Sequence, residues 1–484
     1  MTIEHLDVII IGAGLSGIGA AVHLQKNCPQ HQFAILESRR QLGGTWDLFR
    51  YPGIRSDSDM YTLGYSFKPW SDSKSIADGA KIWNYIADTA QQHDLGKRIR
   101  YEQRVVAAQW SSDQKQWAVD VETGPAKQRV QMTCQFLLIC TGYYNYERGY
   151  TPEFKGQERY QGSVVHPQKW DESLDYAGKR VVIIGSGATA VTLVPAMAKT
   201  AAHVTMLQRS PTYIVARPAQ DALANWLNRH LPSKSAYLLS RWKNVLLGML
   251  FYGYSKRRPE VMKRFIIKGV RQALPAGYDV EKHFTPSYNP WDQRVCLIPD
   301  ADLFKSIRRG QASVVTDHID HFTETGIQLT SGATLDADII VTATGLDLLA
   351  LGGMQLIIDG KPLVLNQTMT YKGMMLAGVP NMAYVTGYTN ASWTLKADLI
   401  SAYVCRILNT LRDKGYRAAV PKQTDPTMQA VRWVDFTSGY IERSIEKFPM
   451  QGNKAPWRLY QNYPKDMASL KFGSLHDKAM HFEK

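Results

Sequence analysis

A strand, a glycine-rich turn and a helix open the sequence and constrain its fold more than any other feature. Residues 7–24 read DVIIIGAGLSGIGAAVHL, in which Gly12, Gly14 and Gly17 form the pattern G-x-G-x-x-G. Gly12 permits a tight turn, Gly14 lets the backbone approach a pyrophosphate, and Gly17 lets the helix pack closely on the strand. The helix then begins near Ser16 with its partial positive charge towards the phosphates. The pattern predicts a parallel α/β sheet that binds a dinucleotide.

The next predicted strand, residues 33–36, supports this interpretation through the acid that follows it. Glu37 lies twenty positions after Gly17. A carboxylate at this distance accepts hydrogen bonds from a ribose 2′-hydroxyl and disfavours a 2′-phosphate. A chance glycine turn is the alternative, but it does not explain the acid. The first site is therefore predicted to bind FAD or NAD rather than NADP.

A second turn of the same kind occurs at residues 180–198, RVVIIGSGATAVTLVPAMA, where the pattern is G-x-G-x-x-A. The strand that follows it leads into Arg209 and Ser210 instead of an acid. A guanidinium can hold a 2′-phosphate with two hydrogen bonds, so this site is predicted to prefer NADPH. The alternative for Arg209 is a solvated side chain at a strand end. The expected contacts are Gly185, Ser186, Gly187, Ala188, Thr189, Ala190, Arg209 and Ser210.

Composition excludes several other classes of protein. The 484 residues are 44% hydrophobic and 21% charged, as in ordinary globular proteins. The five cysteines form no Cys-x-x-Cys pair, which argues against a disulfide framework, a metal site and a dithiol centre. We find no secretory signal and no apolar run of the ~20 residues that a membrane-spanning helix needs, and expect a cytoplasmic protein. The net charge of +14 fits a basic solvated surface, because no nucleic-acid-binding motif accompanies it.

Two longer motifs carry a resemblance to a known family. Residues 43–57, GGTWDLFRYPGIRSD, combine G-G-x-W, Y-P-G and a final Asp57, and residues 160–171 read YQGSVVHPQKWD. Both resemble signatures of the Baeyer–Villiger monooxygenases, which are class B flavoprotein monooxygenases. Tyr160 stands where the family usually has Phe. TWDLFRYPGIRSDSDMYTLG, YNPWDQR and GYTNASWTLKADL are similar to a mycobacterial branch that activates thioamide prodrugs such as ethionamide.

The resemblance implies a reaction and its cofactors. Such enzymes bind FAD and NADPH, and their reduced flavin reacts with O2 to give a C4a-peroxyflavin. This oxidant inserts one oxygen atom next to a ketone carbonyl to form an ester or lactone, and it can also oxygenate the sulfur of sulfides or thioamides. The expected substrates are O2 and hydrophobic small molecules, with no nucleic-acid partner.

The resemblance also assigns catalytic residues. Arg294, which ends YNPWDQR, matches the family's essential arginine. Its charge would stabilise a peroxide anion and the attacked carbonyl, and Asp57 would hold it in place. Gln293 replaces a frequent Lys that contacts the 2′-phosphate, while His166 and Trp170 are expected to pack the linker between the two nucleotide domains. The remaining predicted cofactor contacts are Ser16, Gly44, Thr45, Trp46, Asp47, Leu48, Arg55, Ser56 and Val105.

The predicted fold class is α/β, with two Rossmann-like, doubly wound dinucleotide-binding domains and a helical insert in the second. An FAD domain takes residues 1–145 and 346–484, an NADP domain takes 146–219 and 289–345, and the insert takes 220–288. In the insert, Trp242, Leu246, Leu247, Leu250 and Phe251 are expected to pack between helices, or else to line a substrate route. Basic residues beside this apolar stretch leave open weak peripheral association with the inner face of the cell membrane.

Two other functions remain as alternatives. A flavin monooxygenase that oxygenates only nitrogen or sulfur would share both nucleotide sites, and product analysis would distinguish it. A redox-gated FAD/NAD(P)H protein that binds nucleic acid would explain the net charge and would bind DNA in a salt-sensitive way.

Overall fold

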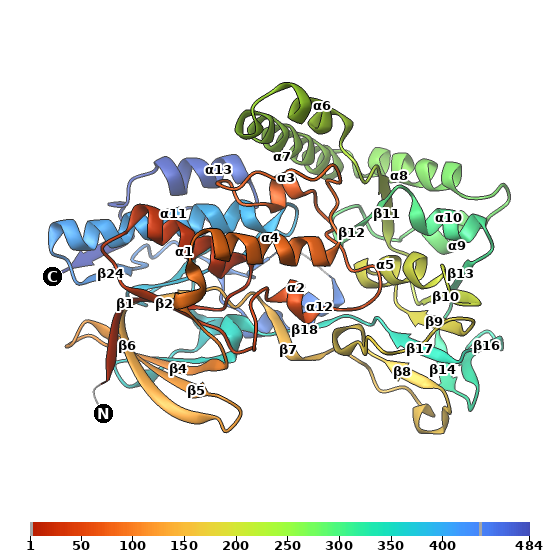
Figure 1. Cartoon of the computed structure of the whole chain (residues 1–484), viewed down its shortest axis with the longest axis horizontal. Helices are drawn as coiled ribbons and strands as arrows, with labels where there is room; N and C mark the ends of the chain where they lie inside the picture. The colour runs from red at the N-terminus through yellow and green to blue at the C-terminus, as the bar shows by residue number, and fades with distance from the viewer. Residues whose placement is uncertain (1–2, 435–437) are drawn as a thin grey trace.

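The larger sheet joins strands from both ends of the chain. The structure is a computed structural model that describes residues 3–434 and 438–484. In that part of the chain the sheet runs β20-β19-β4-β5-β6-β1-β2-β3, with β23 also paired to β6 (Figure 1). The strands are β1 (Glu4–Ile11), β2 (Phe33–Leu36), β3 (Ile99–Arg100), β4 (Gln103–Ser111), β5 (Gln116–Thr123), β6 (Gln128–Ile139), β19 (Gln355–Ile358), β20 (Lys361–Pro362) and β23 (Met382–Tyr384).

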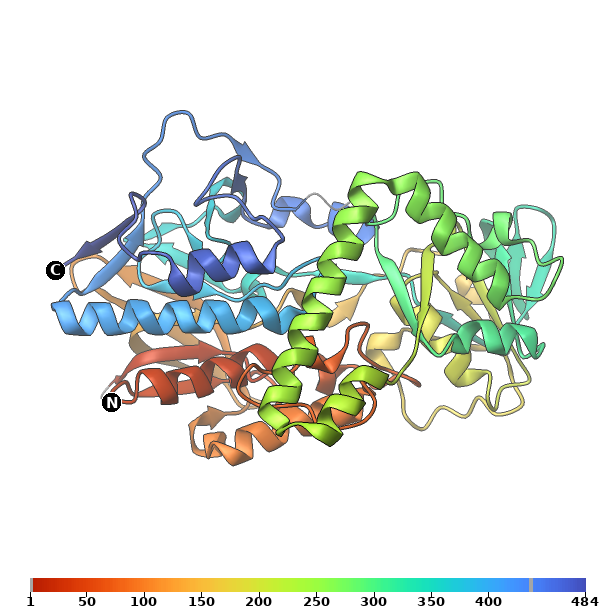
Figure 2. The same cartoon turned by 90° about the horizontal axis from the view of Figure 1, so that it is seen from above.

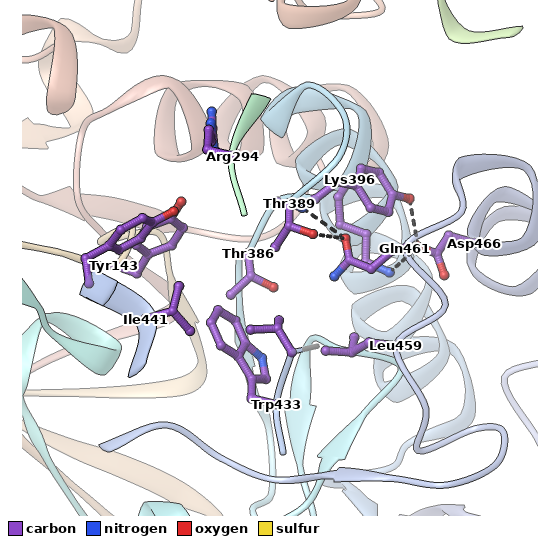
Figure 3. Close-up of a pocket in the computed structure, with 14 residues that line it drawn as sticks. Tyr143, Arg294, Thr386, Thr389, Lys396, Trp433, Ile441, Leu459, Gln461 and Asp466 are labelled. Carbon is purple, nitrogen blue, oxygen red and sulfur yellow. Dashed lines mark hydrogen bonds and ion pairs between the residues drawn. The ribbon is translucent and has the colours of Figure 1, made fainter. Parts of the chain in front are cut away.

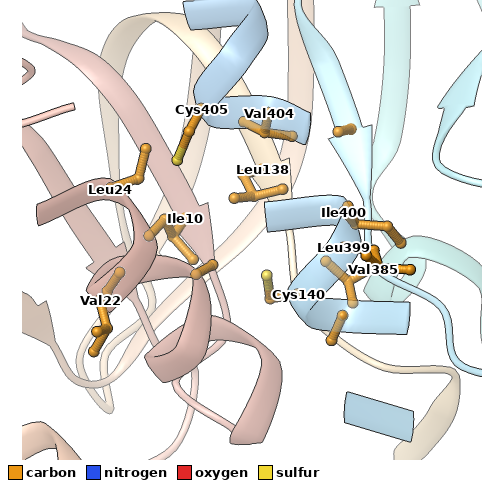
Figure 4. Close-up of a cluster of buried hydrophobic side chains, with 14 of the residues drawn as sticks. Ile10, Val22, Leu24, Leu138, Cys140, Val385, Leu399, Ile400, Val404 and Cys405 are labelled. Carbon is orange, nitrogen blue, oxygen red and sulfur yellow. The ribbon is translucent and has the colours of Figure 1, made fainter. Parts of the chain in front are cut away.

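Two long helices cover one face of this sheet. α1 (Leu15–Asn27) and α11 (Trp393–Lys414) pack against each other although nearly the whole chain separates them. Ile10 and Leu138 of the sheet lie under Leu24, Ile400 and Cys405 of the helices (Figure 4). Residues 8–11 of β1 and the whole of β2 are continuously apolar because both faces of these parallel strands are covered there.

A smaller sheet of five strands forms the second unit. Its order is β13-β10-β9-β17-β8, and every pairing is parallel. α5 and α10 pack together on it. The elements are β8 (Ser163–Val165), β9 (Arg180–Ile184), α5 (Ala188–Met197), β10 (His203–Gln208), α10 (Asp302–Arg308), β13 (Ala312–Thr316) and β17 (Ile339–Thr342). The larger sheet is mixed, with parallel pairings among β6, β1, β2 and β3 and antiparallel pairings of β4, β5 and β6. Its parallel part and the wholly parallel smaller sheet, each covered by helices, confirm the predicted fold class.

The predicted insert region, residues 220–288, contains four helices. They are α6 (Ala222–His230), α7 (Ser233–Arg257), α8 (Pro259–Ala273) and α9 (Val280–Phe284). The parallel pair β11 (Tyr213–Arg217) and β12 (Val295–Pro299) brackets them. α8 packs beside β11, while α7 extends over the first unit and packs on α3 (Met60–Leu63) (Figures 1 and 2). The insert therefore touches both units, although the sequence assigned it to the second; the domain boundaries themselves stay a prediction.

The chain passes between the two units twice, and the crossings pair. β7 (Tyr144–Gly149) runs antiparallel to β18 (Leu346–Leu348). The shorter elements include α2 (Thr45–Leu48), α4 (Gly79–Gln92), α12 (Gly439–Glu442), α13 (Tyr463–Met467), β14 (Ile319–Phe322), β15 (Gly326–Leu329), β16 (Thr334–Asp336), β21 (Thr370–Tyr371), β22 (Met375–Leu376), β24 (Ala418–Pro421), β25 (Ala430–Val431), β26 (Gln451–Gly452) and β27 (Met480–Glu483).

Candidate functional site

The turn between β1 and α1 can be built only with glycine at two of its positions. Gly12 has φ +101°, and a Cβ there would lie 2.8 Å from the carbonyl oxygen of Cys140. A Cβ on Gly17 would lie 1.8 Å from the carbonyl oxygen of Gly12. The missing side chains let the helix N-terminus sit against the sheet, where its free backbone N–H groups can bind an anion.

This turn borders a cavity of about 780 Å³, which we call the first cavity. Glu37 lies at its wall and is buried. Its carboxylate accepts hydrogen bonds from the backbone N–H groups of Ala13 at 2.7 Å and Arg39 at 2.9 Å. The oxygen bonded to Ala13 keeps a second lone pair for a ribose hydroxyl, whereas the other also accepts a longer bond of 3.4 Å from Ser38 Oγ. The predicted residues that line this cavity are Gly12, Gly14, Ser16, Glu37, Gly44, Thr45, Trp46, Ser56, Asp57, Val105 and Arg294.

The turn after β9 borders the second cavity, of about 740 Å³. A Cβ on Gly185 would lie 2.4 Å from the carbonyl oxygen of Ala343, whereas a Cβ on Gly187 would meet open space. Arg209 and Ser210 are exposed at the cavity wall. The predicted residues that line it are Thr45, Trp46, Arg55, Ser56, Asp57, Gly185, Ser186, Gly187, Ala188, Thr189, Arg209, Ser210 and Arg294.

The two cavities meet at the aromatic stretch of residues 43–57. Both are lined by Thr45, Trp46, Ser56, Asp57, Tyr144 and Arg294. Phe49 and Tyr51 of the same stretch are buried in the core of the second unit. Arg55 forms an ion pair with Asp302 at the start of α10, so a loop of the first unit is fastened to the second. The stretch thus forms the partition between the two cavities.

Asp57 and Arg294 form an ion pair at this junction. Burial by itself would raise the pKa of the Asp57 carboxyl, but the charge and hydrogen bond of Arg294 outweigh it and hold that pKa below its usual value. Attraction to Asp57 raises the pKa of Arg294. Both groups are therefore charged at neutral pH. About a third of each side chain remains exposed, 36% for Arg294 and 38% for Asp57, and can face a bound molecule.

A third, smaller cavity of about 20 Å³ also reaches Arg294, from the side of α11 (Figure 3). Its volume holds roughly one water molecule. In its wall, Lys396 forms an ion pair with Asp466 at 2.7 Å, and the hydroxyl of Tyr388 donates a hydrogen bond of 2.7 Å to the same carboxylate. Burial lowers the pKa of Lys396 despite this partner. The other wall consists of side chains such as Trp433, Ile441 and Leu459 and is largely apolar.

Several residues at these cavities were not predicted from the sequence. Tyr143 and Tyr440 line the third cavity beside Arg294, and burial raises the pKa of both hydroxyls, which stay protonated and can donate hydrogen bonds. Trp393 lines the first cavity, and its indole N–H donates to Ser16 Oγ at 2.7 Å. Tyr143 directly follows Thr141 and Gly142, just after β6 ends at Ile139. Lys396 and Asp466 gave no signal in the sequence, because 70 residues separate them.

Four of the predicted cofactor contacts line neither large cavity. Gly17 and Ala190 are buried against their own strands, in keeping with the packing role of the third position of each glycine pattern. Asp47 is buried and forms ion pairs with Arg39 at 2.5 Å and Arg50 at 2.7 Å. Asp47 and Leu48 are themselves part of α2, and the two ion pairs of Asp47 hold this short helix in place. Their assignment as contacts stays a prediction.

His166 and Trp170 lie away from the described cavity walls. A Cβ on Gly149 would lie 2.0 Å from the His166 ring, so the imidazole packs directly on β7. Burial lowers the pKa of His166, which favours a neutral ring at pH 7. This position agrees with packing of the inter-unit linker.

A family model described as "Flavin-binding monooxygenase-like" matches residues 5–349. The FAD-containing monooxygenase EthA of Mycobacterium tuberculosis is 52% identical over 482 residues, covering 99% of this chain and 98% of that protein. The crystal structure of OTEMO with FAD and NADP has a TM-score of 0.71 at 23% identity and covers 87% of each chain. The oxidised steroid monooxygenase bound to NADP has a TM-score of 0.75 at 21% identity and covers 99% and 100%.

Proposed function

The chain belongs to the flavin-binding monooxygenase-like family, and from that premise we propose that it is an FAD-containing, NADPH-dependent Baeyer–Villiger monooxygenase. Its substrates are hydrophobic ketones, which it converts to esters, and it also oxygenates the sulfur of sulfides or thioamides. The observation that carries the proposal is the Asp57–Arg294 ion pair, because it lies where both nucleotide-sized cavities meet.

The first cavity fits FAD. Its volume of about 780 Å³ lies within the range of ligand pockets, roughly 300–1,000 Å³. Glycines leave the α1 N-terminus open to a pyrophosphate, and Glu37 keeps acceptor capacity for a ribose hydroxyl. Trp46, Tyr143 and Trp393, which line the same cavity as Arg294, would hold the flavin ring.

The second cavity fits NADPH. Gly187 leaves room at the α5 N-terminus, where a Cβ would otherwise enter the cavity. Arg209 and Ser210 stand at the end of β10, where the first unit has the ribose acid. In the described part of the chain Arg209 forms no ion pair, so its guanidinium is available to a 2′-phosphate. Gln293 also lines this cavity but carries no charge.

Bound FAD, reduced by NADPH, would supply the two electrons that activate O2, one atom of which is transferred to the substrate. In the overall reaction one oxygen atom enters the ester, the other leaves as water, and NADPH provides two electrons. Arg294 would hold a positive charge beside the reacting oxygen atom and the attacked carbonyl oxygen, where negative charge develops. Asp57 would hold Arg294 in position, and the protonated hydroxyls of Tyr143 and Tyr440 would add hydrogen-bond donors beside it.

The test is product analysis with ¹⁸O2. Purified protein with FAD and NADPH should convert a linear methyl ketone or an aryl methyl ketone to an ester that contains one ¹⁸O atom. The same preparation should convert an aryl methyl sulfide to its sulfoxide. Sulfoxide without any ester across a panel of ketones would overturn the Baeyer–Villiger assignment and would favour a flavin monooxygenase limited to nitrogen and sulfur.

A further inference from the structure

The helical insert exposes an unusually apolar surface on one side of the molecule. We define the insert face by six exposed residues of α6, α7 and α8: Trp226, Leu239, Leu246, Leu250, Tyr254 and Phe265. Leu250 is 68% exposed and Phe265 is 66% exposed, although leucine and phenylalanine are usually buried. The three helices that carry these residues lie together at the top of the molecule in Figure 1 and in front of it in Figure 2.

The exposed apolar side chains of α7 do not belong to the side of the helix that packs on the protein. On α7 the buried positions, such as Tyr237, Arg241 and Val245, recur every four residues along one side. Leu239, Leu246, Leu250 and Tyr254 recur at intervals of seven, four and four residues along the opposite side. The helix therefore carries two apolar sides, of which the structure buries only one. A surface helix of a protein that stays in water needs a single apolar side.

Positive charges predominate on the helices that carry the insert face. Residues 220–288 contain twelve Lys and Arg but only four Asp and Glu. Arg229, Lys234, Arg257, Arg264 and Lys268 are all exposed on α6, α7 and α8. A like copy of this surface would repel it, which disfavours dimerisation through this face. A partner with negative charges around an apolar interior complements both the basic residues and the exposed apolar side chains.

We propose that the insert face docks the protein on the surface of an anionic lipid bilayer. The exposed leucines and aromatics would enter the boundary between headgroups and acyl chains, and the basic residues would bind the anionic headgroups. No helix in the described residues is long and apolar enough to cross a membrane, so the interaction is peripheral. A nucleic acid would bind the charges but would offer nothing to the apolar centre.

The docked orientation also places the membrane next to the candidate site. The buried side of α7 packs through Val245, with Trp242 and Met249, on Tyr388 and Leu395 of the α11 region. Tyr388 lines both the first and the third cavity. A single helix thus separates the proposed lipid surface from the cavity wall, an arrangement suited to apolar substrates that partition into lipid.

Vesicle co-sedimentation of the full-length protein tests the proposal. The probes are vesicles of phosphatidylcholine alone and of phosphatidylcholine with phosphatidylglycerol, each at low and high salt. The protein should sediment with the anionic vesicles and bind less at high salt. Leu246→Glu combined with Leu250→Glu should lower the partition coefficient at least about tenfold, because two inserted apolar side chains become charged. Val130→Glu combined with Val364→Glu, at exposed positions of the first unit, is the matched control and should bind normally.

Two outcomes would overturn the proposal. One is equal binding to neutral and anionic vesicles, or unchanged binding of the Leu246 and Leu250 double variant. The other is a wild-type protein that fails to bind vesicles but dimerises in light scattering, with a monomeric double variant, which would assign the insert face to a second copy. Far-ultraviolet circular dichroism keeps folding separate from binding, since all four substituted positions are exposed.

Discussion

Arg294 is the residue on which the proposed chemistry depends most directly, since it lines all three cavities. Among the residues that the structure describes, its own unit supplies no counter-ion for it; the partner, Asp57, comes from the loop of the first unit. Arg55, two residues before Asp57 in the same loop, forms an ion pair with Asp302. A guanidinium fixed in this way can act on charge that develops in either cavity.

Arg294→Ala should separate NADPH oxidation from oxygen transfer. FAD should stay bound, because the glycine turns and Glu37 lie elsewhere. NADPH consumption should continue while ester formation falls by at least about 100-fold, the cost of removing one stabilising donor from a transition state. The lost oxygen should appear as hydrogen peroxide. Parallel assays of NADPH, peroxide and ester check this.

Asp57→Ala provides a graded comparison for that experiment. A mobile Arg294 would occupy its position only part of the time, so less ester should form per NADPH than in the wild type but more than in Arg294→Ala. If both variants lost thermal stability but kept the wild-type ratio of ester to NADPH, the pair would be a structural ion pair without a part in oxygen transfer.

Arg209 should determine the preference for NADPH over NADH. Arg209→Ala should raise the KM for NADPH by about 10–150-fold, the equivalent of one charged contact of roughly 1.5–3 kcal/mol, with little change for NADH. Arg217→Ala, an exposed arginine outside the lining of the second cavity, is the control. Equal losses with both cofactors would show that Arg209 does not contact the 2′-phosphate.

At the scale of secondary-structure elements, the buried Arg241 helps to hold α7 on the first unit. Arg241 donates hydrogen bonds of 2.8 Å to the carbonyl oxygens of Tyr61 and Gly64, and its guanidinium lies 3.6 Å from the Asp398 carboxylate on α11. Burial would raise the pKa of Asp398, but hydrogen bonding to His23 and the charges of His23 and Arg241 lower it below its usual value. α7 is thereby tied to the helix that borders the first cavity.

Arg241→Met should weaken this attachment in a pH-dependent way. At pH 7 the free energy of unfolding should fall by about 3–5 kcal/mol, because Asp398 is left as a buried, poorly compensated charge. The lowered pKa of Asp398 stabilises the fold at pH values above the unfolded-state pKa of about 3.9, and this contribution is lost as the pH falls below that value. The difference in unfolding free energy between the variant and the wild type should therefore shrink as the pH falls below about 4.

Denaturant unfolding followed by circular dichroism at several pH values checks this prediction. Lys243→Met, a substitution also on α7, is the control. It removes a partly exposed ion pair with Asp221 and should lower the free energy of unfolding by no more than about 1 kcal/mol. A difference between Arg241→Met and wild type that is independent of pH would mean that lost packing, rather than the charge on Asp398, causes the destabilisation.

At the scale of the whole molecule, the two cavities make stability depend on the cofactors. Removing FAD should lower the thermal midpoint of unfolding, and adding it back should restore it, because a ligand at about 1,000 times its Kd stabilises by roughly 4 kcal/mol. NADP⁺ should add a further, smaller shift that Arg209→Ala reduces. Differential scanning fluorimetry measures both shifts, and a midpoint unaffected by FAD would refute the assignment of the first cavity.

The sequence determined the fold class and both nucleotide turns, because those features depend on local patterns. The turn after β1 needs glycine for steric reasons that act within a few residues, and the continuous apolar strands reveal parallel sheets buried on both faces. The Asp57–Arg294 pair also came from sequence, but only through the family resemblance: 237 residues separate the two, and no local pattern joins them.

Only the tertiary structure decided what each side of a helix faces. The sequence predicted that Leu246, Leu247 and Leu250 pack between helices or line a substrate route. Packing between helices was wrong, since all three are exposed, while Trp242 and Phe251 are half-buried; the substrate route stays a prediction. Periodicity identifies an apolar side but does not say whether protein covers it. Likewise Ser392 begins α11 without a side-chain cap, because its hydroxyl is hydrogen-bonded to Thr62 instead.

The same limit applies to Lys396 and Asp466 in the third cavity and to the attachment of α7 by Arg241. Such contacts join residues far apart in the chain, and their existence depends on how separately specified elements pack together. Local sequence determined the helices, the strands and the two glycine-rich turns of this protein. The junction of its three cavities at Arg294 is a product of packing, because it requires loops from both units and the α11 region to meet at one guanidinium.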